Sequence, residues 1–311
     1  MPRQDPLPDP PAQDGLAAGI VAFSPDPGTI LPLVATVAPQ VGTIFVFINA
    51  LIDEPLKAEL GRIPKVVILD SDVNFGIGTA LNVIVLGAAL AGFRHVILFD
   101  QDSRPDAALV PGLLASFGSL VAAGETPAVV GPRLVAPAGE GYKSPRYFRR
   151  PGAAPRGDLT PVRYLPTSGS LVSVEAFRRI VAFRGDYFID GIDLDWCFRA
   201  WAGGYSCWCA AAIPMPHTVG QGIVGSRAWG LETPRQHGFR LETYVRNTVY
   251  GFRLPHVPWS WKLRQGAYLI IQMAVVTAAS GSRASLIRRL GRGVLDGLRG
   301  RLGPPEGAPR A

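Results

Sequence analysis

The stretch HVILFDQDS, residues 95–103, joins an unbroken apolar run to two carboxylates. An apolar run without alternating polar residues is typical of a strand that is buried on both faces of a sheet. Three similar runs come earlier in the chain: GIVAF at 19–23, TIFVFI at 43–48 and VVIL at 66–69. We therefore expect four buried strands in the first third of the sequence.

Helical patterns separate these runs, and strands that alternate with helices predict βαβ units in a mostly parallel sheet. The expected helices span 30–38, 54–60 and 77–91. Ligands of such sheets bind beyond the carboxyl ends of the strands. Functional side chains are therefore expected just after the strands. The candidates are Ser24, Asn49, Asp72, Asp100 and Asp102.

The second half of the sequence is less regular. We expect a loop over the sheet at 139–163, a strand at 164–174, a helix at 175–181, a carboxylate-rich stretch at 186–202 and a strand at 205–212. The first 15 residues contain five prolines and predict a loose lead-in. The chain therefore divides into a flexible lead-in at 1–18, one α/β domain at 19–252 and a basic helical tail at 253–311.

Composition excludes a disordered chain, because 48% of the residues are apolar and only 18% are charged. The net charge of +7 is concentrated at one end of the chain. Residues 1–252 hold 21 basic and 22 acidic side chains, whereas residues 253–311 hold 10 basic and 2 acidic ones. This distribution argues against nucleic acid bound over the whole surface and favours contact of the tail with anionic lipid.

Cysteine usage and apolar stretches indicate the compartment. Three cysteines, Cys197, Cys207 and Cys209, cannot form an even disulfide framework, so we expect reduced thiols in a cytosolic protein. The N-terminal residues lack the apolar segment of a signal peptide. The uncharged stretch 265–282 is interrupted by Gln272, whereas a membrane span needs about 20 apolar residues. It therefore predicts a docked or interfacial helix.

The FDQDS string at 99–103 places Asp100 and Asp102 after a buried strand. Two carboxylates one residue apart can hold Mg²⁺ or Mn²⁺, which prefer oxygen ligands and keep substrate phosphates in their coordination shell. The alternative is a solvated turn. Residues 72–82, DVNFGIGTALN, could present backbone amides to a diphosphate at a helix start. The alternative there is a plain strand-to-helix turn, because the spacing is not the dinucleotide fingerprint.

A third motif contains Asp190, Asp193 and Asp195. A helix that starts near Asp193 would pair Asp195 with Arg199 four residues later and keep Asp193 ionised at the helix N-terminus. Such a carboxylate suits a general base that faces a hydroxyl. Capping and first-turn acids are the alternative. His217 is a candidate third metal ligand, or simply a hydrogen-bonded residue.

Together these motifs resemble those of family 2 glycosyltransferases of the GT-A fold, especially bacterial rhamnosyltransferases and their galactofuranosyltransferase relatives. The matching strings are NFGIGTALN at 74–82, FDQDS at 99–103, TSGSLVS at 167–173, FIDGIDLDWCFRA at 188–200, HTVG at 217–220 and RLETYVRN at 240–247. They occur in the family's order within residues 19–250, and FDQDS and FIDGIDLDW are the most specific of them.

The resemblance implies a Rossmann-like, mixed and mostly parallel sheet flanked by helices. It implies that Asp100 and Asp102 hold Mg²⁺ or Mn²⁺ on a nucleotide diphosphate, that His217 is a further ligand, and that Asp193 is the general base. The implied nucleotide contacts are Ser24, Asn49, Asp72, Asn74, Gly76 and Gln101. The implied sugar and acceptor contacts are Thr167, Ser168, Gly169, Asp195, Trp196 and Arg199.

The sequence departs from the family pattern in places. FINA at 47–50 stands where the family has an Asp-Asn-Gly-Ser type of string, so the contacts to the nucleotide base are in doubt. Ile192 stands where some relatives have an acid. Glu242 and Thr243 replace aromatic residues, which puts the acceptor contacts in doubt.

The expectation is an inverting, metal-dependent glycosyltransferase on the inner face of the cell membrane. The favoured donor is dTDP-rhamnose, and the acceptor is a hydroxyl of a cell-surface glycan or a polyprenyl-linked glycan. A sugar-phosphate nucleotidyltransferase is one alternative, although residues 24–28 carry no Arg or Lys. An inactive membrane-docked scaffold is the other; the Asn49 region favours it and the acidic motifs oppose it.

The tail contains a basic amphipathic segment at 285–302. On a helical wheel one half is apolar, and the other half carries arginines, a pattern typical of an interfacial anchor. The apolar half contains Leu286, Ile287, Leu290, Val294, Leu295, Leu298 and Leu302. Four glycines weaken the isolated helix, so we expect it to order on a membrane or to pack on its own domain.

Overall fold

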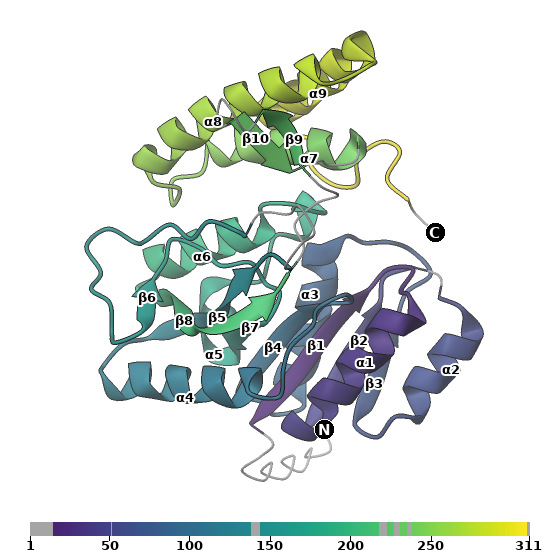
Figure 1. Ribbon diagram of the computed structural model, residues 1–311, viewed down its shortest axis with the longest axis vertical. Coiled ribbons are helices and arrows are strands. Elements are labelled where there is room, and N and C mark those ends of the chain that lie inside the picture. Colours follow the sequence, from purple (N-terminus) through teal and green to yellow (C-terminus); the bar gives the residue numbers. More distant parts are fainter. Residues whose placement is uncertain are drawn as a thin grey trace, which may run out of the picture.

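The computed structural model describes residues 15–50, 52–137, 144–217, 223–226, 231–234 and 238–309. In this part of the chain, a wide sheet is flanked by helices on both faces, and a layer of C-terminal helices lies above it (Figure 1). The strands of the sheet lie in the order β3-β2-β1-β4-β7-β5-β8-β6. Their bounds are β1 Leu16–Ala22, β2 Thr43–Ile48, β3 Val66–Asp70, β4 His95–Asp100, β5 Pro127–Val135, β6 Leu159–Pro161, β7 Ser170–Ser173 and β8 Ser206–Pro216.

The strand directions confirm the expected mixed, mostly parallel sheet. Strands β1 to β4 are parallel to one another, with Ile20 opposite both Val46 and Phe99. Strand β7 is antiparallel to β4 and β5, while β8 is parallel to β5 and antiparallel to β6. The carboxyl ends of β1 to β4 therefore share one edge of the sheet, where a ligand is expected.

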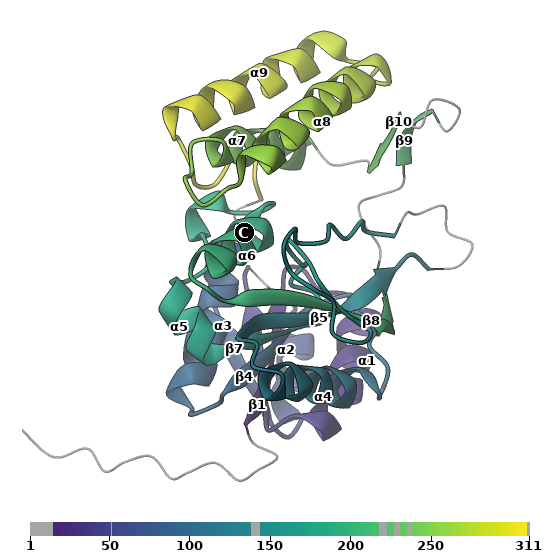
Figure 2. The ribbon, with the colours of Figure 1, turned by 90° about the vertical axis from the view of Figure 1, so that its left-hand side faces the viewer.

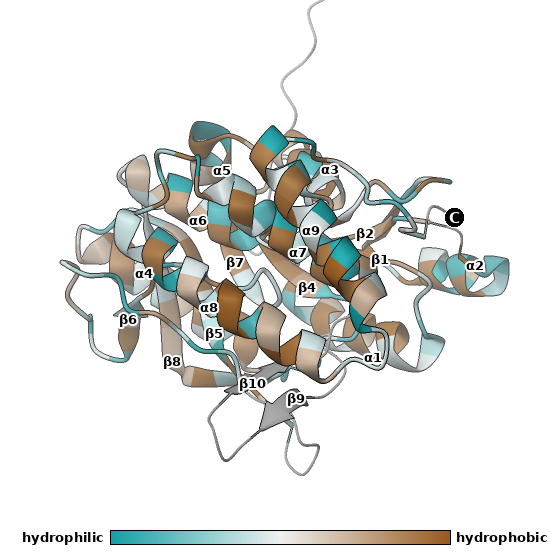
Figure 3. Cartoon of the chain, turned by 90° about the horizontal axis from the view of Figure 1, so that it is seen from above, coloured by the Kyte–Doolittle hydropathy of each residue, from teal (hydrophilic) through white to brown (hydrophobic). Residues whose placement is uncertain are grey.

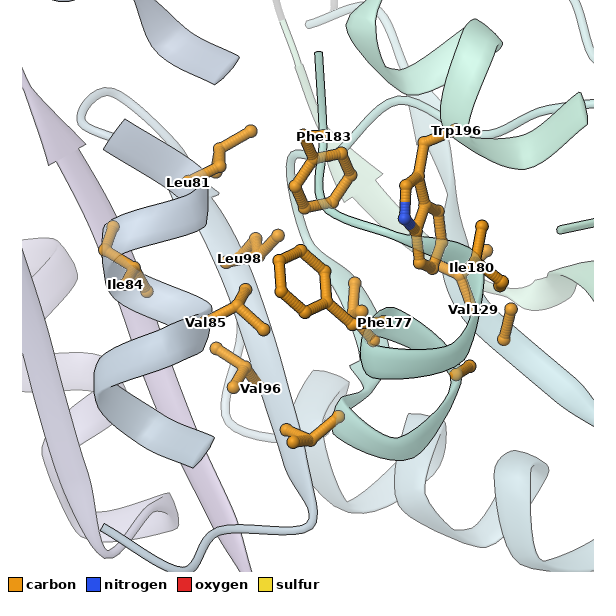
Figure 4. Packing of buried hydrophobic residues seen from close by; sticks show 14 of the residues in the cluster. Leu81, Ile84, Val85, Val96, Leu98, Val129, Phe177, Ile180, Phe183 and Trp196 are labelled. Carbon is orange, nitrogen blue, oxygen red and sulfur yellow. The ribbon is translucent and has the colours of Figure 1, made fainter. Parts of the chain in front are cut away.

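Helices cover both faces of this sheet. Their bounds are α1 Pro27–Val37, α2 Glu54–Arg62, α3 Ile77–Leu90, α4 Leu109–Ala122, α5 Val174–Ile180 and α6 Ile192–Ala202, with 3-10 turns at Ala38–Gln40 and Gly185–Tyr187. Helices α1, α2 and α4 pack on one face, and α3, α5 and α6 on the other. In the second group, Ile84 of α3, Leu98 of β4 and Phe177 of α5 lie in one buried cluster (Figure 4).

Helix α4 and strand β5 are among the elements that had no counterpart in the prediction, and β6 lies within the expected loop at 139–163. Helix α4 contains Pro111 and two glycines, and β5 begins with Pro127 and contains Pro132, so both read as broken patterns. The strand expected at 164–174 is shorter, because β7 covers only Ser170–Ser173. Strand β1 begins three residues before the predicted start at Gly19. The lead-in falls largely outside the described residues.

A C-terminal layer contains helices α7 Gly238–Gly251, α8 Trp259–Ala278 and α9 Arg283–Arg299, next to the antiparallel pair β9 Ile223–Ser226 and β10 Leu231–Pro234 (Figure 2). Helices α7, α8 and α9 share a small apolar cluster that includes Val245, Leu269 and Leu290. The chain segments on either side of the predicted boundary at 252 therefore pack on each other. No helix of the described residues is long and apolar enough to cross a membrane.

Glycines set the distance between α7 and α9. A Cβ atom at Gly293 would lie 2.7 Å from the carbonyl oxygen of Glu242, and one at Gly297 would lie 2.5 Å from that of Arg246. Two of the glycines that weaken an isolated helix are thus the residues that let α9 approach α7 closely. The three cysteines are buried and unpaired, as expected.

Candidate functional site

Asp100 ends β4 and is half-buried at the carboxyl edge of the sheet. Burial raises the pKa of this carboxyl group, and Asp102 raises it too, whereas His217, Arg240 and a hydrogen bond with Ser168 lower it. The Ser168 hydroxyl is also 2.8 Å from that of Ser103, so the loop before β7 is fixed to the loop after β4. The fold therefore brings Asp100, Ser168 and His217 together.

Asp102 has a different environment from Asp100. It is exposed, and it lines a hollow of about 240 Å³ between α1 and residues 102–105. Between the two carboxylates, the Gln101 amide accepts a hydrogen bond from the Phe23 amide and donates one to the Phe23 carbonyl oxygen. Gln101 thus fastens the end of β4 to the end of β1 through both atoms of its side-chain amide.

Asp193 lies in the first turn of α6 and is half-buried. Burial raises the pKa of Asp193 to about 6; the Leu194 amide, which donates to Oδ1 at 2.8 Å, lowers it, and the charges of Asp190 and Asp100 raise it. Asp193 and Asp100 are therefore close enough to interact, although one lies on α6 and the other on β4. At neutral pH such a carboxylate is ionised and still basic enough to accept a proton.

The loop before α6 has a strained backbone and is held in place by hydrogen bonds from α7. Phe188 and Asp190 adopt left-handed backbone conformations, with φ of +63° and +64°, which are unusual for residues other than glycine. The Nδ2 atom of Asn247 on α7 donates hydrogen bonds to the carbonyl oxygens of Tyr187, Ile189 and Asp190 at 2.9–3.0 Å. Helix α7 thus fixes the loop that delivers Asp193.

Arg240 on α7 makes a second connection to this loop. Its Nε and Nη2 atoms donate to the Asp190 carboxylate at 3.0–3.1 Å. The pKa of Arg240 is raised mainly by Asp190 and further by Asp100 and Asp193. Its positive charge therefore stands among three carboxylates and faces the region between β4 and α6.

Asp195 and its partners support α6 from behind. The predicted pair with Arg199 forms, with Nε 2.8 Å from Oδ2, and His256 lies 2.8 Å from Oδ1. Although burial alone would raise it, these two partners hold the pKa of Asp195 below its usual range. Arg199 also donates to the carbonyl oxygens of residues 180–182, so both residues belong to the scaffold of the site.

Trp196 differs from its expected role beside the sugar. Its side chain is 1% exposed, its ring packs against Phe183, and its Nε1 donates to the carbonyl oxygen of Val181. A ring on the inward face of α6 is covered by α5 and by the segment that follows it. Trp196 therefore stabilises the helix and does not reach the region between Asp100 and Asp193.

The predicted nucleotide contacts divide into two groups. Asn49 and Asn74 are buried and bonded to each other, with Asn49 Nδ2 donating to Asn74 Oδ1 at 3.0 Å. Asn74 Nδ2 donates in turn to the carbonyl oxygen of Pro309. Gly76, with φ of +81°, is buried against Phe188, whereas Ser24 and Asp72 are exposed at the carboxyl edge. Ser24 and Asp72 are thus the accessible members of this set.

The loop of Thr167, Ser168 and Gly169 lies beside Asp100. Gly169 donates its amide to the Leu98 carbonyl oxygen and has φ of +72°, and a Cβ atom there would lie 2.8 Å from Met215. Thr167 is half-buried next to it. This loop therefore shapes the wall between β4 and β8.

The side chains at this edge of the sheet include ligands that suit a hard divalent cation. Within the described residues, no three His, Cys, Asp or Glu side chains are grouped closely enough to hold a metal ion. Mg²⁺ and Mn²⁺, however, are commonly bound by one or two carboxylates together with water and substrate phosphates. Asp100 and the exposed Asp102 meet that requirement.

Three comparisons place this architecture among known proteins. No family profile matches the chain. The dTDP-rhamnosyl transferase RfbF of Shigella flexneri is 25% identical over 289 residues, which are 91% of this chain and 95% of that protein.

Two solved structures have a similar fold. S. aureus TarS 1–349 in complex with UDP-GlcNAc matches with a TM-score of 0.56 at 11% identity, over 92% of this chain and 82% of that one. GalNAc-T7 with UDP, GalNAc and Mn²⁺ matches with a TM-score of 0.55 at 12% identity, over 85% of this chain but only 56% of that one. These likenesses concern the fold.

The chain is a glycosyltransferase of the GT-A fold. The sequence of this glycosyltransferase does not reveal the roles of Arg240 and Asn247, because their partners lie at least 50 residues earlier in the chain. The string RLETYVRN contained both, but the pattern of charges alone did not say what they contact. His256 had no sequence signal.

Proposed function

We propose that the protein is an inverting, metal-dependent glycosyltransferase that uses a nucleotide diphosphate sugar, with dTDP-rhamnose favoured. The observation that carries the proposal is electrostatic: the charge of Asp100, at the end of β4, acts on Asp193, at the start of α6, and Arg240 acts on both. Two carboxylates on separate elements, one raised in pKa to about 6 and one beside an exposed acid, suit two different tasks. The similarity to a dTDP-rhamnosyl transferase supports the choice of sugar.

In this proposal, Asp100 and Asp102 hold a divalent cation, and His217 lies beside them as a further ligand. A bound Mg²⁺ or Mn²⁺ would neutralise charge on the departing diphosphate. The Arg240 guanidinium, which faces both Asp100 and Asp193, adds positive charge on the same side. The loop at Ser168 and Gly169 borders the donor sugar, and Ser24 and Asp72 border the nucleotide.

Transfer is a single displacement. Asp193 takes the proton from an acceptor hydroxyl, and the oxygen of that hydroxyl forms a bond to the anomeric carbon. The bond between that carbon and the diphosphate oxygen breaks, its electron pair leaves with the nucleoside diphosphate, and the anomeric configuration inverts. The acceptor in this proposal is a glycan or a polyprenyl-linked glycan.

Slow hydrolysis of the donor tests the proposal without the acceptor. The purified chain is incubated with dTDP-rhamnose, UDP-GlcNAc or UDP-GalNAc, each with Mn²⁺, with Mg²⁺ or with a chelator, and released nucleotide is resolved by chromatography. We expect release of dTDP from dTDP-rhamnose only when metal is present. The absence of nucleotide diphosphate from every donor would contradict the proposal, and formation of a nucleoside triphosphate on addition of pyrophosphate would indicate a nucleotidyltransferase.

A further inference from the structure

Helix α8 has an apolar stripe that is exposed among the residues that the structure describes. Trp259, Leu263 and Ile270 are 74%, 72% and 66% exposed. Their spacing of four and seven residues places them on one side of the helix, with the exposed Ala267 and Ala274 on the same side. The opposite side of α8 contains Trp261 and Leu269, which are buried.

Helix α9 divides the apolar half that its sequence predicts. Leu286, Leu290 and Val294 pack in the cluster shared with α7 and α8. Ile287, Leu295 and Leu298 point elsewhere, and they are 56%, 48% and 59% exposed. One side of α9 therefore packs on the domain while another side exposes apolar residues. The helix can pack on its own domain and still offer an apolar surface to a membrane.

The two stripes belong to one outer surface. Helices α8 and α9 lie side by side at the end of the molecule farthest from the sheet (Figures 1 and 2). A view onto this end shows apolar segments along both helices (Figure 3). We call this surface, made by the exposed residues of α8 and α9, the outer face.

Positive charges surround the outer face. Arg288 and Arg299 are exposed beside the apolar stripe of α9, and Lys262 lies 4.9 Å above the ring of Trp259 on α8. Helix α8 contains no acidic residue, and α9 contains only Asp296. An apolar stripe with basic flanks and an exposed tryptophan is the pattern of a helix that lies in the plane of a membrane interface.

We propose that the outer face binds an anionic lipid bilayer, with α8 and α9 lying flat on it and with Trp259, Leu263, Ile270 and Leu298 entering the headgroup region. Charge decides between occupants. A second copy of the chain, packed face to face, would bring arginines against arginines, whereas phosphatidylglycerol headgroups neutralise them.

Vesicle flotation with the full chain tests this assignment. The probes are vesicles of phosphatidylcholine alone and of phosphatidylcholine mixed with phosphatidylglycerol. The test variant is Leu263→Glu, and its matched control is Leu90→Glu, because Leu90 is 76% exposed at the end of α3, away from the outer face. Circular dichroism confirms that each variant is folded. Arg288→Glu combined with Arg299→Glu tests the charges.

We expect at least about tenfold tighter binding to the anionic vesicles than to the neutral ones, and at least about tenfold weaker binding after Leu263→Glu or after the double arginine change. Leu90→Glu should bind like the wild type. Equal binding to both vesicle types, no binding at all, or equal losses in the two leucine variants would overturn the proposal. So would a wild-type dimer that Leu263→Glu dissociates.

Donor hydrolysis without vesicles keeps this result separate from the proposed function. All of these variants should hydrolyse the donor at the wild-type rate, because none of the changed side chains lies at the site. Vesicle binding without hydrolysis would count against the proposed function alone.

Discussion

The sheet and the C-terminal layer are built in opposite ways. In the sheet, the helix sides that face the strands are covered, and Leu60 of α2 is 0% exposed. In the layer, Leu263 of α8 is 72% exposed, and the shared apolar cluster is small. The layer therefore adds little to the hydrophobic core. Its inner side fixes the loop that carries Asp193, and its outer side presents apolar and basic groups.

Several polar connections of the layer reach the same segment, residues 187–195. Arg240 contacts Asp190, Asn247 contacts the carbonyl oxygens of residues 187–190, and His256 contacts Asp195. These bonds join the layer to the segment that carries the proposed base. A substitution that breaks them should therefore lower turnover more than it lowers the stability of the fold.

Two leucines test the contrast most strongly. Leu60→Ala should lower the free energy of unfolding by about 2–5 kcal/mol, because it empties a closed core. Leu263→Ala should change it by less than about 0.5 kcal/mol, because little apolar surface is buried there. Denaturant unfolding of both variants measures the two values. Similar losses would show that α8 is covered in solution and would remove the contrast.

Asn247→Ala should cost about 1–3 kcal/mol of stability, because it leaves buried carbonyl oxygens without a donor. It should also lower kcat, since the loop before α6 is released. The matched control is Asn82→Ala, because Asn82 of α3 makes two hydrogen bonds with the backbone of Phe183 and does not contact that loop. A fall in kcat of the same size in the control would mean that Asn247 acts only through general stability.

Asp102→Asn tests the sheet side of the site. We expect metal-dependent donor binding to weaken by at least about tenfold, while binding without metal stays unchanged, because the variant loses a charged oxygen ligand. Titration calorimetry with and without Mn²⁺ measures both. Stability should hardly change for an exposed side chain, and an unaltered affinity in Mn²⁺ would remove Asp102 from the donor site.

A smaller effect is expected from pH. The base must be ionised, and burial raises the pKa of Asp193 to about 6, so kcat/KM should fall as the pH is lowered through 6. Between pH 7.5 and 5.5 the loss should be about fourfold if this group alone titrates. A flat profile over that range, with the fold intact by circular dichroism, would disprove the pKa that burial and Asp100 impose.

Much of the sheet could be predicted because β1, β2 and β4 are buried on both faces, whereas β3 was wrongly expected to be buried: it is the edge strand and has no buried residue. Ile20, Val46 and Ile97 belong to continuous apolar runs that need no knowledge of their neighbours. Helix α4 could not be predicted in the same way, because Pro111 and Gly112 interrupt its pattern, and only burial of Leu113 and Phe117 against the sheet shows it to be a helix.

The site was predictable where chemistry follows a strand or opens a helix, as at Asp100 and in the pair of Asp195 with Arg199. It was not predictable where tertiary contacts decide. Gln101, Asn49 and Asn74 resemble nucleotide contacts in sequence, yet their amides bond to the protein itself. The apolar half of α9 is divided into a buried part and an exposed part because the helix packs on α7. A helical wheel does not show this packing, so the division could not be predicted.

In the proposed reaction, Asp193 carries the transfer step, while Asp100 and Asp102, at and after the end of β4, hold the donor. Turnover and donor affinity of Asp193→Asn, measured on one preparation in Mn²⁺, test it most directly. We predict a loss of turnover of at least about a thousandfold, with a dissociation constant for the donor within about threefold of the wild type. Retained turnover, or loss of donor binding equal to the loss of turnover, would contradict it.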